Sequence, residues 1–72
     1  MEKPTHVDEA ALLWDYGTTS RLIDIPVRTL RRHVAERTGP RVVRIGRHVR
    51  FRPQDVRDWI ERLGQRETED VA

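Results

Sequence analysis

The spacing of apolar residues changes from the period of a helix to that of a strand within residues 26–52, PVRTLRRHVAERTGPRVVRIGRHVRFR. In the first half, the apolar residues recur at intervals of three and four, which places them on one face of a helix: Val27, Leu30 and Val34. Pro26 suits the start of such a helix, because the amide proton that it lacks would have no partner there. We therefore predict a helix from Pro26 to about Arg37, ended by Thr38-Gly39-Pro40.

The second half, residues 41–52, has the period of two that is typical of a strand. Apolar residues alternate with arginines on both sides of Gly46-Arg47-His48, a sequence that favours a reversal of the chain. This alternation predicts a β-hairpin with its arginines pointing outward and its apolar residues pointing inward, namely Val43, Ile45, Val49 and Phe51.

Further helical patterns precede and follow this stretch. A short helix is predicted over residues 8–14, with Gly17 as the residue that stops it. A second helix is predicted to open at Thr18 or Thr19 and to end at the tight turn Asp24-Ile25. Pro53 opens a last helix, which Gly64 ends, and its apolar residues recur at helical spacing: Val56, Trp59, Ile60 and Leu63.

Two helices joined by a tight turn and followed by a hairpin form a winged helix-turn-helix. We therefore predict an α+β fold of this kind over residues 18–63, with the helix after the turn as recognition helix and the hairpin as wing. Residues 1–17 are predicted to form a tail and an extra N-terminal helix, and residues 64–72 an acidic tail. A helix of about ten residues can enter a DNA major groove, which is about 12 Å wide.

The charged residues are segregated along the chain, although the formal net charge is only +2. Residues 18–52 contain ten arginines and two acidic residues, whereas residues 1–17 contain one lysine and four acidic residues. Residues 53–72 contain three arginines and six acidic residues. The basic segment coincides with the predicted recognition helix and wing. Because arginine binds phosphate in a bidentate geometry and also recognises guanine edges, this distribution predicts double-stranded DNA as the partner.

The composition argues against several other classes of protein. There are 0 cysteines, which excludes disulfides and thiolate metal sites, and the longest apolar run, Ala10 to Trp14, is too short to span a bilayer. The histidines His6, His33 and His48 lack the spacing of metal ligands. We therefore expect no metal, no cofactor, no membrane contact and no enzymatic activity.

Three segments resemble the MerR-like excisionase family of winged-helix proteins: TSRLIDIPVRTLRR (19–32), VVRIGRHVRF (42–51) and DVRDWI (55–60). The resemblance covers about residues 18–63, and its most specific part is the wing followed by DVRDWI. The sequence departs from the family pattern at Arg31, where an aromatic residue is common, and at Asp24, where a turn glycine is frequent.

The resemblance implies a recombination directionality factor of a phage or mobile element. Such a protein binds several adjacent sites near a phage attachment site, bends the DNA and helps a phage integrase to favour excision over integration. It also implies that the protein acts in the cytoplasm of a bacterial host cell.

The predicted DNA contacts lie on three elements. On the recognition helix they are Arg28, Thr29, Arg31 and Arg32. On the wing they are Arg44, Arg47, His48 and Arg50. On the first helix of the motif they are Thr19, Ser20 and Arg21. For any single arginine, a contact with a base edge and a contact with phosphate alone both stay open.

Two further questions stay open at this point. Leu13 and Trp14 either close the core of the monomer or form a surface for self-association on DNA. A small winged-helix transcriptional repressor would share every contact residue with an excisionase, and a protein-interaction module, such as an antitoxin or an adaptor, would use the arginines to bind an acidic partner.

Overall fold

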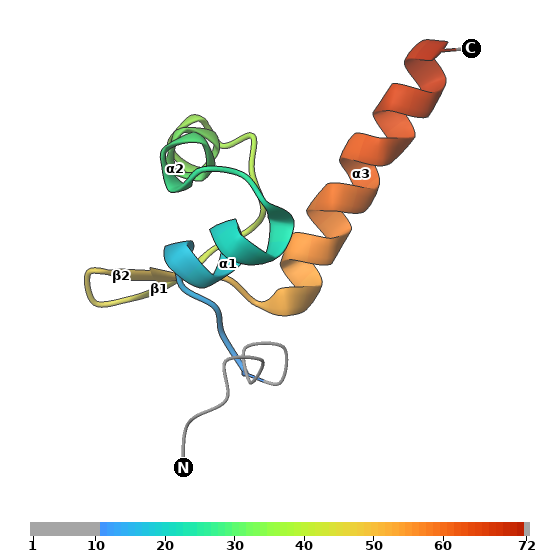
Figure 1. Ribbon diagram of the computed structural model, residues 1–72. Coiled ribbons are helices and arrows are strands. Elements are labelled where there is room, and N and C mark those ends of the chain that lie inside the picture. The colour runs from blue at the N-terminus through green and yellow to red at the C-terminus, as the bar shows by residue number, and fades with distance from the viewer. Residues whose placement is uncertain (1–10, 72) are drawn as a thin grey trace.

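A computed structural model describes the backbone of residues 11–71 and the side chains of residues 11–66. The elements follow in the order α1 (Tyr16–Ile23), α2 (Val27–Glu36), β1 (Val43–Ile45), β2 (His48–Arg50) and α3 (Pro53–Val71). The two strands pair antiparallel and project from one side of the three helices (Figure 1). This order and arrangement confirm the predicted α+β winged helix-turn-helix.

The extra N-terminal helix is not found over residues 11–14, while residues 8–10 lie outside the described residues. Trp14 instead forms an isolated antiparallel bridge with Phe51, in which each backbone amide donates to the other carbonyl at 2.8 Å. The prediction was wrong for residues 11–14 because a short helix is stable only where tertiary packing favours it. Here the backbone of Trp14 pairs with the end of the hairpin instead.

The first helix of the motif starts earlier than predicted. Asp15 is its N-cap, and the Asp15 carboxylate accepts a hydrogen bond from the Thr18 amide at 2.8 Å. Gly17 therefore lies inside α1 rather than ending a preceding helix, and Thr18 and Thr19 are not caps. The predicted turn after α1 is confirmed, because Asp24 adopts the left-handed conformation with φ 60° and ends the helix.

The hairpin is closed by a turn of two residues, Gly46 and Arg47, since Ile45 pairs with His48. Gly46 has φ 62°, and a positive φ at the first turn position is typical of a type II′ turn, which favours glycine there. Residues that pair across an antiparallel ladder point to the same face. Val43 therefore shares a face with Arg50, and Arg44 shares the opposite face with Val49.

This register corrects the predicted division into an apolar face and an arginine face. Val49 packs against the core, whereas Ile45, on the opposite face, is 53% exposed. The two strand arginines, Arg44 and Arg50, point to opposite faces of the hairpin rather than jointly outward.

α3 begins at Pro53 as predicted but continues through Gly64 to Val71. Its first half packs on the body of the domain and its second half extends away from it (Figure 1). Gly64 costs a helix only about 1 kcal/mol relative to alanine, and the residues that follow it are strong helix formers such as Gln65 and Arg66. The predicted helix end at Gly64 was therefore wrong.

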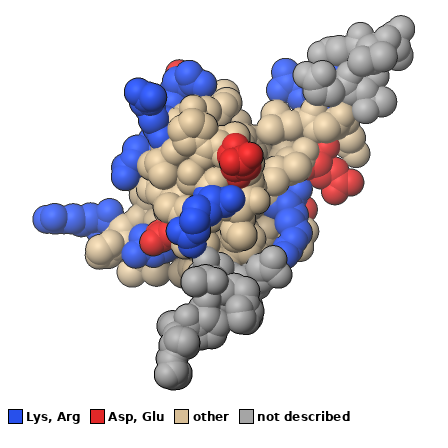
Figure 2. All heavy atoms as spheres, viewed as in Figure 1, with Lys and Arg blue, Asp and Glu red and all other residues tan. Residues whose placement is uncertain are grey.

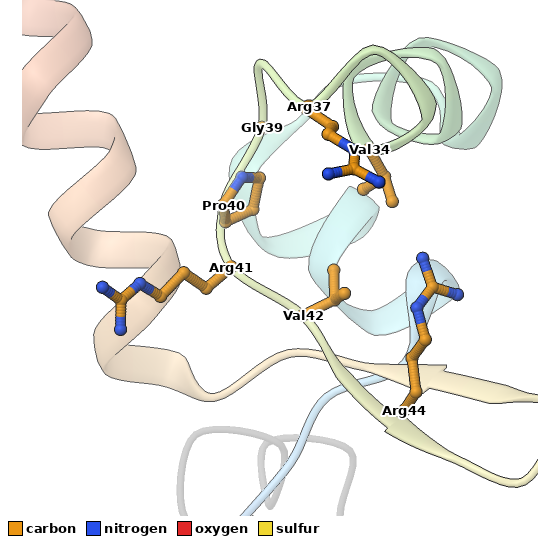
Figure 3. A pocket seen from close by; sticks show the side chains of 7 residues that line it. All are labelled: Val34, Arg37, Gly39, Pro40, Arg41, Val42 and Arg44. Carbon is orange, nitrogen blue, oxygen red and sulfur yellow. The ribbon is translucent and has the colours of Figure 1, made fainter.

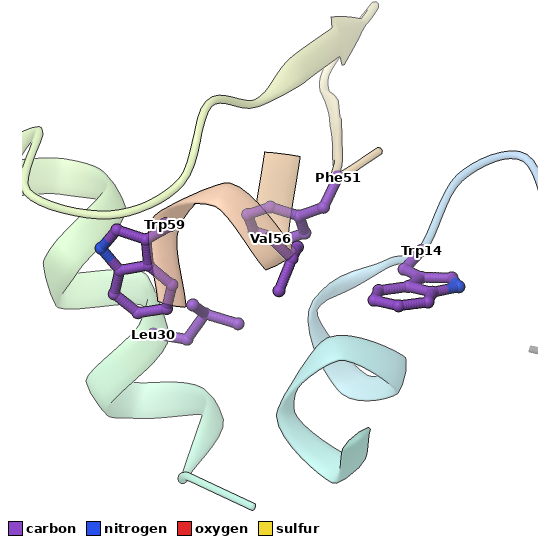
Figure 4. Close-up of a cluster of buried hydrophobic side chains, with 5 residues drawn as sticks. All are labelled: Trp14, Leu30, Phe51, Val56 and Trp59. Atoms are coloured by element: carbon purple, nitrogen blue, oxygen red, sulfur yellow. The ribbon is translucent and has the colours of Figure 1, made fainter. Parts of the chain in front are cut away.

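The core brings together residues of α2 and α3 with the two residues of the isolated bridge: Trp14, Leu30, Phe51, Val56 and Trp59 (Figure 4). Trp59 reaches from α3 toward the end of α2, and its indole N–H donates to the Thr38 carbonyl at 2.9 Å. The Trp59 ring also meets the His33 ring edge-on, with centroids 5.6 Å apart. These contacts fix the position of α2, the predicted recognition helix, on the domain.

Candidate nucleic-acid interface

α2 presents two arginines on the side opposite its buried residue. Leu30 is 0% exposed and anchors the helix, whereas Arg28 and Arg32 are exposed and lie one turn apart. The amphipathic spacing of the sequence produces this arrangement, because the inward positions are apolar and the outward positions are basic. α2 therefore carries a stripe of two guanidinium groups into solvent.

Arg31 has a different environment from Arg28 and Arg32. The Arg31 guanidinium carbon lies 4.4 Å from the centroid of the Tyr16 ring, a cation–π geometry. The Tyr16 ring in turn meets Phe51 edge-on, with centroids 5.3 Å apart and planes at 79°. This chain of contacts joins α2 to the residue that ends the wing, so the spacing between recognition helix and wing is set by packed side chains.

The wing, residues 43–50, carries its cations at three different places. Arg47 is exposed in the turn, and Arg44 and Arg50 lie on opposite faces of the hairpin. His48 is also exposed, beside the turn. Arg50 is half-buried, and its Nη1 donates to the Val49 carbonyl at 2.9 Å. The wing therefore offers positive charge at its tip and on both flanks.

A hollow of about 400 Å³ separates the start of α1 from the wing, and it is lined by arginines of both contact elements, Arg31, Arg47 and Arg50. Asp15 lines the same hollow. The hydrogen bonds from Thr18 to its carboxylate lower the pKa of Asp15, and the positive charge of Arg50 lowers it further. At neutral pH this hollow therefore contains an ionised carboxylate beside its cations.

Within residues 11–66, a salt bridge joins Arg52 Nε to Asp55 Oδ2 at 2.7 Å, outside α2 and the wing, and none joins an arginine of α2 or of the wing to a carboxylate. The contact with Asp55 raises the pKa of Arg52. The Asp15 carboxylate attracts Arg50 without forming a salt bridge with it. Figure 2 shows basic side chains projecting over α2 and over the wing on the same side of the molecule, with further basic side chains over α1 and α3.

Two of the three predicted contacts of α1, Thr19 and Ser20, use their hydroxyl groups inside the domain. Thr19 is 0% exposed, and its hydroxyl donates to the Asp15 carbonyl at 2.9 Å, so its side chain does not reach the surface. The Ser20 hydroxyl donates to the carbonyl of Ile25 in the turn. Arg21 is exposed. The threonine and the serine thus stabilise the helix-turn-helix, and the prediction of Thr19 as a DNA contact disagrees with its burial.

Thr29 lies away from the wing, on the flank of α2 that faces α1 and α3. It lines an apolar hollow with Leu22, Ile60 and Leu63. The predicted contact between Thr29 and DNA stays a prediction, and it would have to come from this flank.

The buried position of Trp14 answers the question left open for the N-terminal segment. Trp14 is 6% exposed and belongs to the core cluster, which confirms the alternative in which it closes the core of the monomer. Leu13 is half-buried beside it. An interface for self-association through Trp14 disagrees with this burial.

One arginine next to the predicted contacts was missed. Arg37 follows α2 directly and is exposed near the junction of helix and wing. The sequence signal available was its place inside the basic segment, but it does not fall on a regular period that would have shown its direction.

Comparison with known proteins agrees with this geometry. Residues 18–64 match the sequence model of the family described as helix-turn-helix domain. No curated protein matches the chain significantly. Within residues 11–71 no helix combines the length and the apolarity that crossing a membrane requires. Among the side chains of residues 11–66, no group of three or more His, Cys, Asp or Glu is placed to hold a metal ion.

Proposed function

The chain belongs to the helix-turn-helix domain family, a DNA-binding family, and from this premise we propose that it binds double-stranded DNA with sequence preference and bends its site. We further propose that it acts as an excisionase, which directs a phage integrase toward prophage excision. In this role the protein cuts no DNA, since the integrase supplies the chemistry.

The observation that carries the proposal is the stripe formed by Arg28 and Arg32 on a helix anchored by the buried Leu30. Recognition of a base edge requires a side chain that is held in a fixed place relative to the groove, and bidentate arginine–guanine contacts are the commonest kind. The buried face of α2 supplies that fixed place.

DNA bending is supported by the link between α2 and the wing. Arg31, Tyr16 and Phe51 hold the two elements at a set spacing through packed rings. When α2 occupies a major groove, the wing reaches the backbone or the minor groove beside it. If the spacing differs from that of straight DNA, bending of the duplex lets both elements bind at once, and the added contacts offset the cost of the deformation.

The excisionase role rests on the resemblance of the motifs at 19–32, 42–51 and 55–60 to the excisionase family. It predicts three partners or sites: the region of a phage attachment site, a phage integrase, and neighbouring copies bound along the DNA. The proposed place of action is the cytoplasm of a bacterial host cell.

The proposal is tested by gel-shift titration on fragments from an attachment-site region, with the salt concentration varied. We expect a site-dependent affinity that falls steeply with salt, by a log–log slope of about 0.9 for each phosphate contacted. A flat salt response would contradict DNA binding. An acidic protein partner that binds the chain and is not displaced by double-stranded DNA would favour an interaction module.

The finer role is tested with circularly permuted fragments and with an integrase reaction on excision and integration substrates. With an excisionase, the gel mobility of the protein–DNA complex depends on the position of the site in the fragment. The products of the integrase reaction shift toward excision. Binding without an effect on the integrase products, at a site that overlaps a promoter, would favour the repressor instead.

A further inference from the structure

A second hollow, of about 420 Å³, lies between the C-terminal end of α2 and β1. Its lining includes Val34 and Val42 at the base and three arginines, Arg37, Arg41 and Arg44. Figure 3 shows Arg37 and Arg44 reaching into the space from opposite sides, from the end of α2 and from β1, whereas Arg41 extends away from both toward α3. Two guanidinium groups on separate elements thus face one open space.

The two hollows beside the wing differ in charge. The hollow that contains Arg31, Arg47 and Arg50 also contains Asp15, whereas the lining of the hollow at Arg37 and Arg44 has no acidic residue. Within residues 11–66, no salt bridge engages Arg37 or Arg44. The second hollow is therefore the better site for an anion, because nothing in its lining competes for the guanidinium groups.

Arg37 has a backbone conformation that arginine rarely adopts. It ends α2 with φ 63° and ψ 32°, in the left-handed region, and its amide donates to the carbonyls of His33 and Val34. Glycine is the usual residue at this position of a helix end, and a residue with a Cβ is strained there. The conformation turns the Arg37 side chain back over Val34 and toward β1 (Figure 3).

The shape of a duplex shows which anion this hollow would meet. A recognition helix lies along the major groove, so the strand that borders the groove runs roughly parallel to the helix. When the wing reaches the backbone or minor groove next to α2, this strand passes between α2 and the wing. The hollow at Arg37 and Arg44 lies on that path, at the end of α2.

We infer that Arg37 and Arg44 together hold one backbone phosphate of the DNA strand that passes between α2 and the wing. This inference rests on the proposed DNA-binding function and adds a phosphate clamp to it. The clamp fixes the position of the protein along the duplex, while the α2 stripe of Arg28 and Arg32 meets the bases.

The test uses three matched variants of the full chain: Arg37→Gln, Arg44→Gln and, as the control, Arg41→Gln. All three remove one charge from an exposed arginine near the junction of helix and wing. Binding is measured to one preferred DNA site and to a set of duplexes, each with a single neutral methylphosphonate in place of one phosphate. Circular dichroism melting checks that each variant folds.

The parent is expected to lose about tenfold in affinity when one particular phosphate is neutral, the loss expected for a charge-assisted contact. Arg37→Gln and Arg44→Gln should each weaken binding to unmodified DNA by a similar factor and should no longer respond to that methylphosphonate. Arg41→Gln should keep the parent's affinity and response. A variant that combines Arg37→Gln and Arg44→Gln should lose less affinity than the product of the two single losses, because both side chains contact one phosphate.

The inference is overturned if the three variants behave alike, or if Arg37→Gln and Arg44→Gln lose their response at two different phosphates. Either result leaves the DNA-binding function in place, since the parent still binds. A parent that fails to bind any duplex would instead contradict the proposed function, and with it the clamp.

Discussion

α2 and the wing both present arginines, but they are attached to the domain in different ways. α2 is held along its length, with Leu30 fully buried and Val34 packed on the core. The wing is held at one end, where Phe51 is fully buried, and its far apolar residue, Ile45, is 53% exposed. A side chain on α2 therefore has a backbone fixed by the core, whereas the turn at Gly46 and Arg47 has few restraints.

This difference suggests a division of labour in DNA binding. A hydrogen bond to a base edge forms only when the donor is in the correct place, so we expect base recognition from the fixed element, α2. A phosphate attracts positive charge over a longer range and tolerates small displacements, which suits the tip of a hairpin. Single substitutions in the two elements test that division, and the largest effect is expected at Phe51, the buried residue that anchors the wing.

Phe51→Ala should have the largest effect. Removing a fully buried phenylalanine costs about 3–5 kcal/mol, which is comparable to the whole stability of a domain of this size. The Phe51 ring supports the Tyr16 ring of α1, so the loss extends from the wing to α1. Urea denaturation followed by circular dichroism measures the change.

Ile45→Ala is the matched control, because Ile45 lies on the exposed side of the same hairpin. It should change the free energy of unfolding by less than about 0.5 kcal/mol. An equal loss at both positions would mean that the wing is anchored along its whole length, and the comparison with α2 would no longer hold.

Arg28→Ala and Arg47→Ala should separate readout from charge. Arg28→Ala is expected to cost about 1–3 kcal/mol on the preferred site and much less on other sites, since it removes a base contact. Arg47→Ala is expected to weaken binding equally on all sequences and to lower the salt slope by about 0.9. Selection from a randomised duplex library, followed by salt titrations, measures both effects.

The assignment of roles would be reversed if the library selected by Arg47→Ala lost its base preference while that of Arg28→Ala kept it. Arg32→Ala, one turn further along the same stripe, should behave like Arg28→Ala.

The fixed element was also the one that could be predicted from the sequence. The spacing of Val27, Leu30 and Val34 defined both the extent of α2 and its outward face, since helical geometry relates the two without reference to the rest of the chain. The location of the hairpin could be predicted too, because a glycine between two alternating segments favours a tight reversal, and Gly46 does adopt a positive φ of 62°.

Which residues share a face of the wing could not be predicted, because this depends on whether the loop between the strands has two residues or three. A three-residue loop over 46–48 would pair Ile45 with Val49 and put all the apolar residues on one face. The observed two-residue turn pairs Ile45 with His48 and moves one strand's apolar residues to the opposite side. Such a shift of register by one residue reverses every side chain of a strand.

The remaining errors arose where tertiary contacts override local preference. Trp14 and its neighbours have an apolar spacing compatible with a helix, but the backbone of Trp14 pairs with Phe51, 37 positions later in the sequence. α1 is capped at its N-terminus by Asp15, the residue directly after this pairing, rather than by Thr18 or Thr19. The conformation of Arg37, on which the proposed clamp depends, is likewise a property of the folded helix end that composition does not show.

Asp15 lies beside the hollow between α1 and the wing, and its substitution should have the smallest effect of these substitutions, the control Ile45→Ala apart. Asp15→Ala removes the acceptor for the Thr18 amide and should cost about 1 kcal/mol, a typical value for a lost N-cap. Asp15→Asn keeps an acceptor and serves as the control. The loss should appear in α1 and extend to α2, against which α1 packs.

The pH dependence identifies the charge of Asp15 as the cause. Because its hydrogen bonds lower the pKa of Asp15 in the folded state, the ionised carboxylate stabilises the fold at neutral pH. This contribution is present above the unfolded pKa of about 3.9 and is lost as the pH falls through the lower folded pKa. The stability of the parent should therefore approach that of Asp15→Asn as the pH is lowered below about 4. A difference in unfolding free energy between the two proteins that stays constant from pH 7 to pH 2 would mean that the carboxylate charge contributes nothing at this junction.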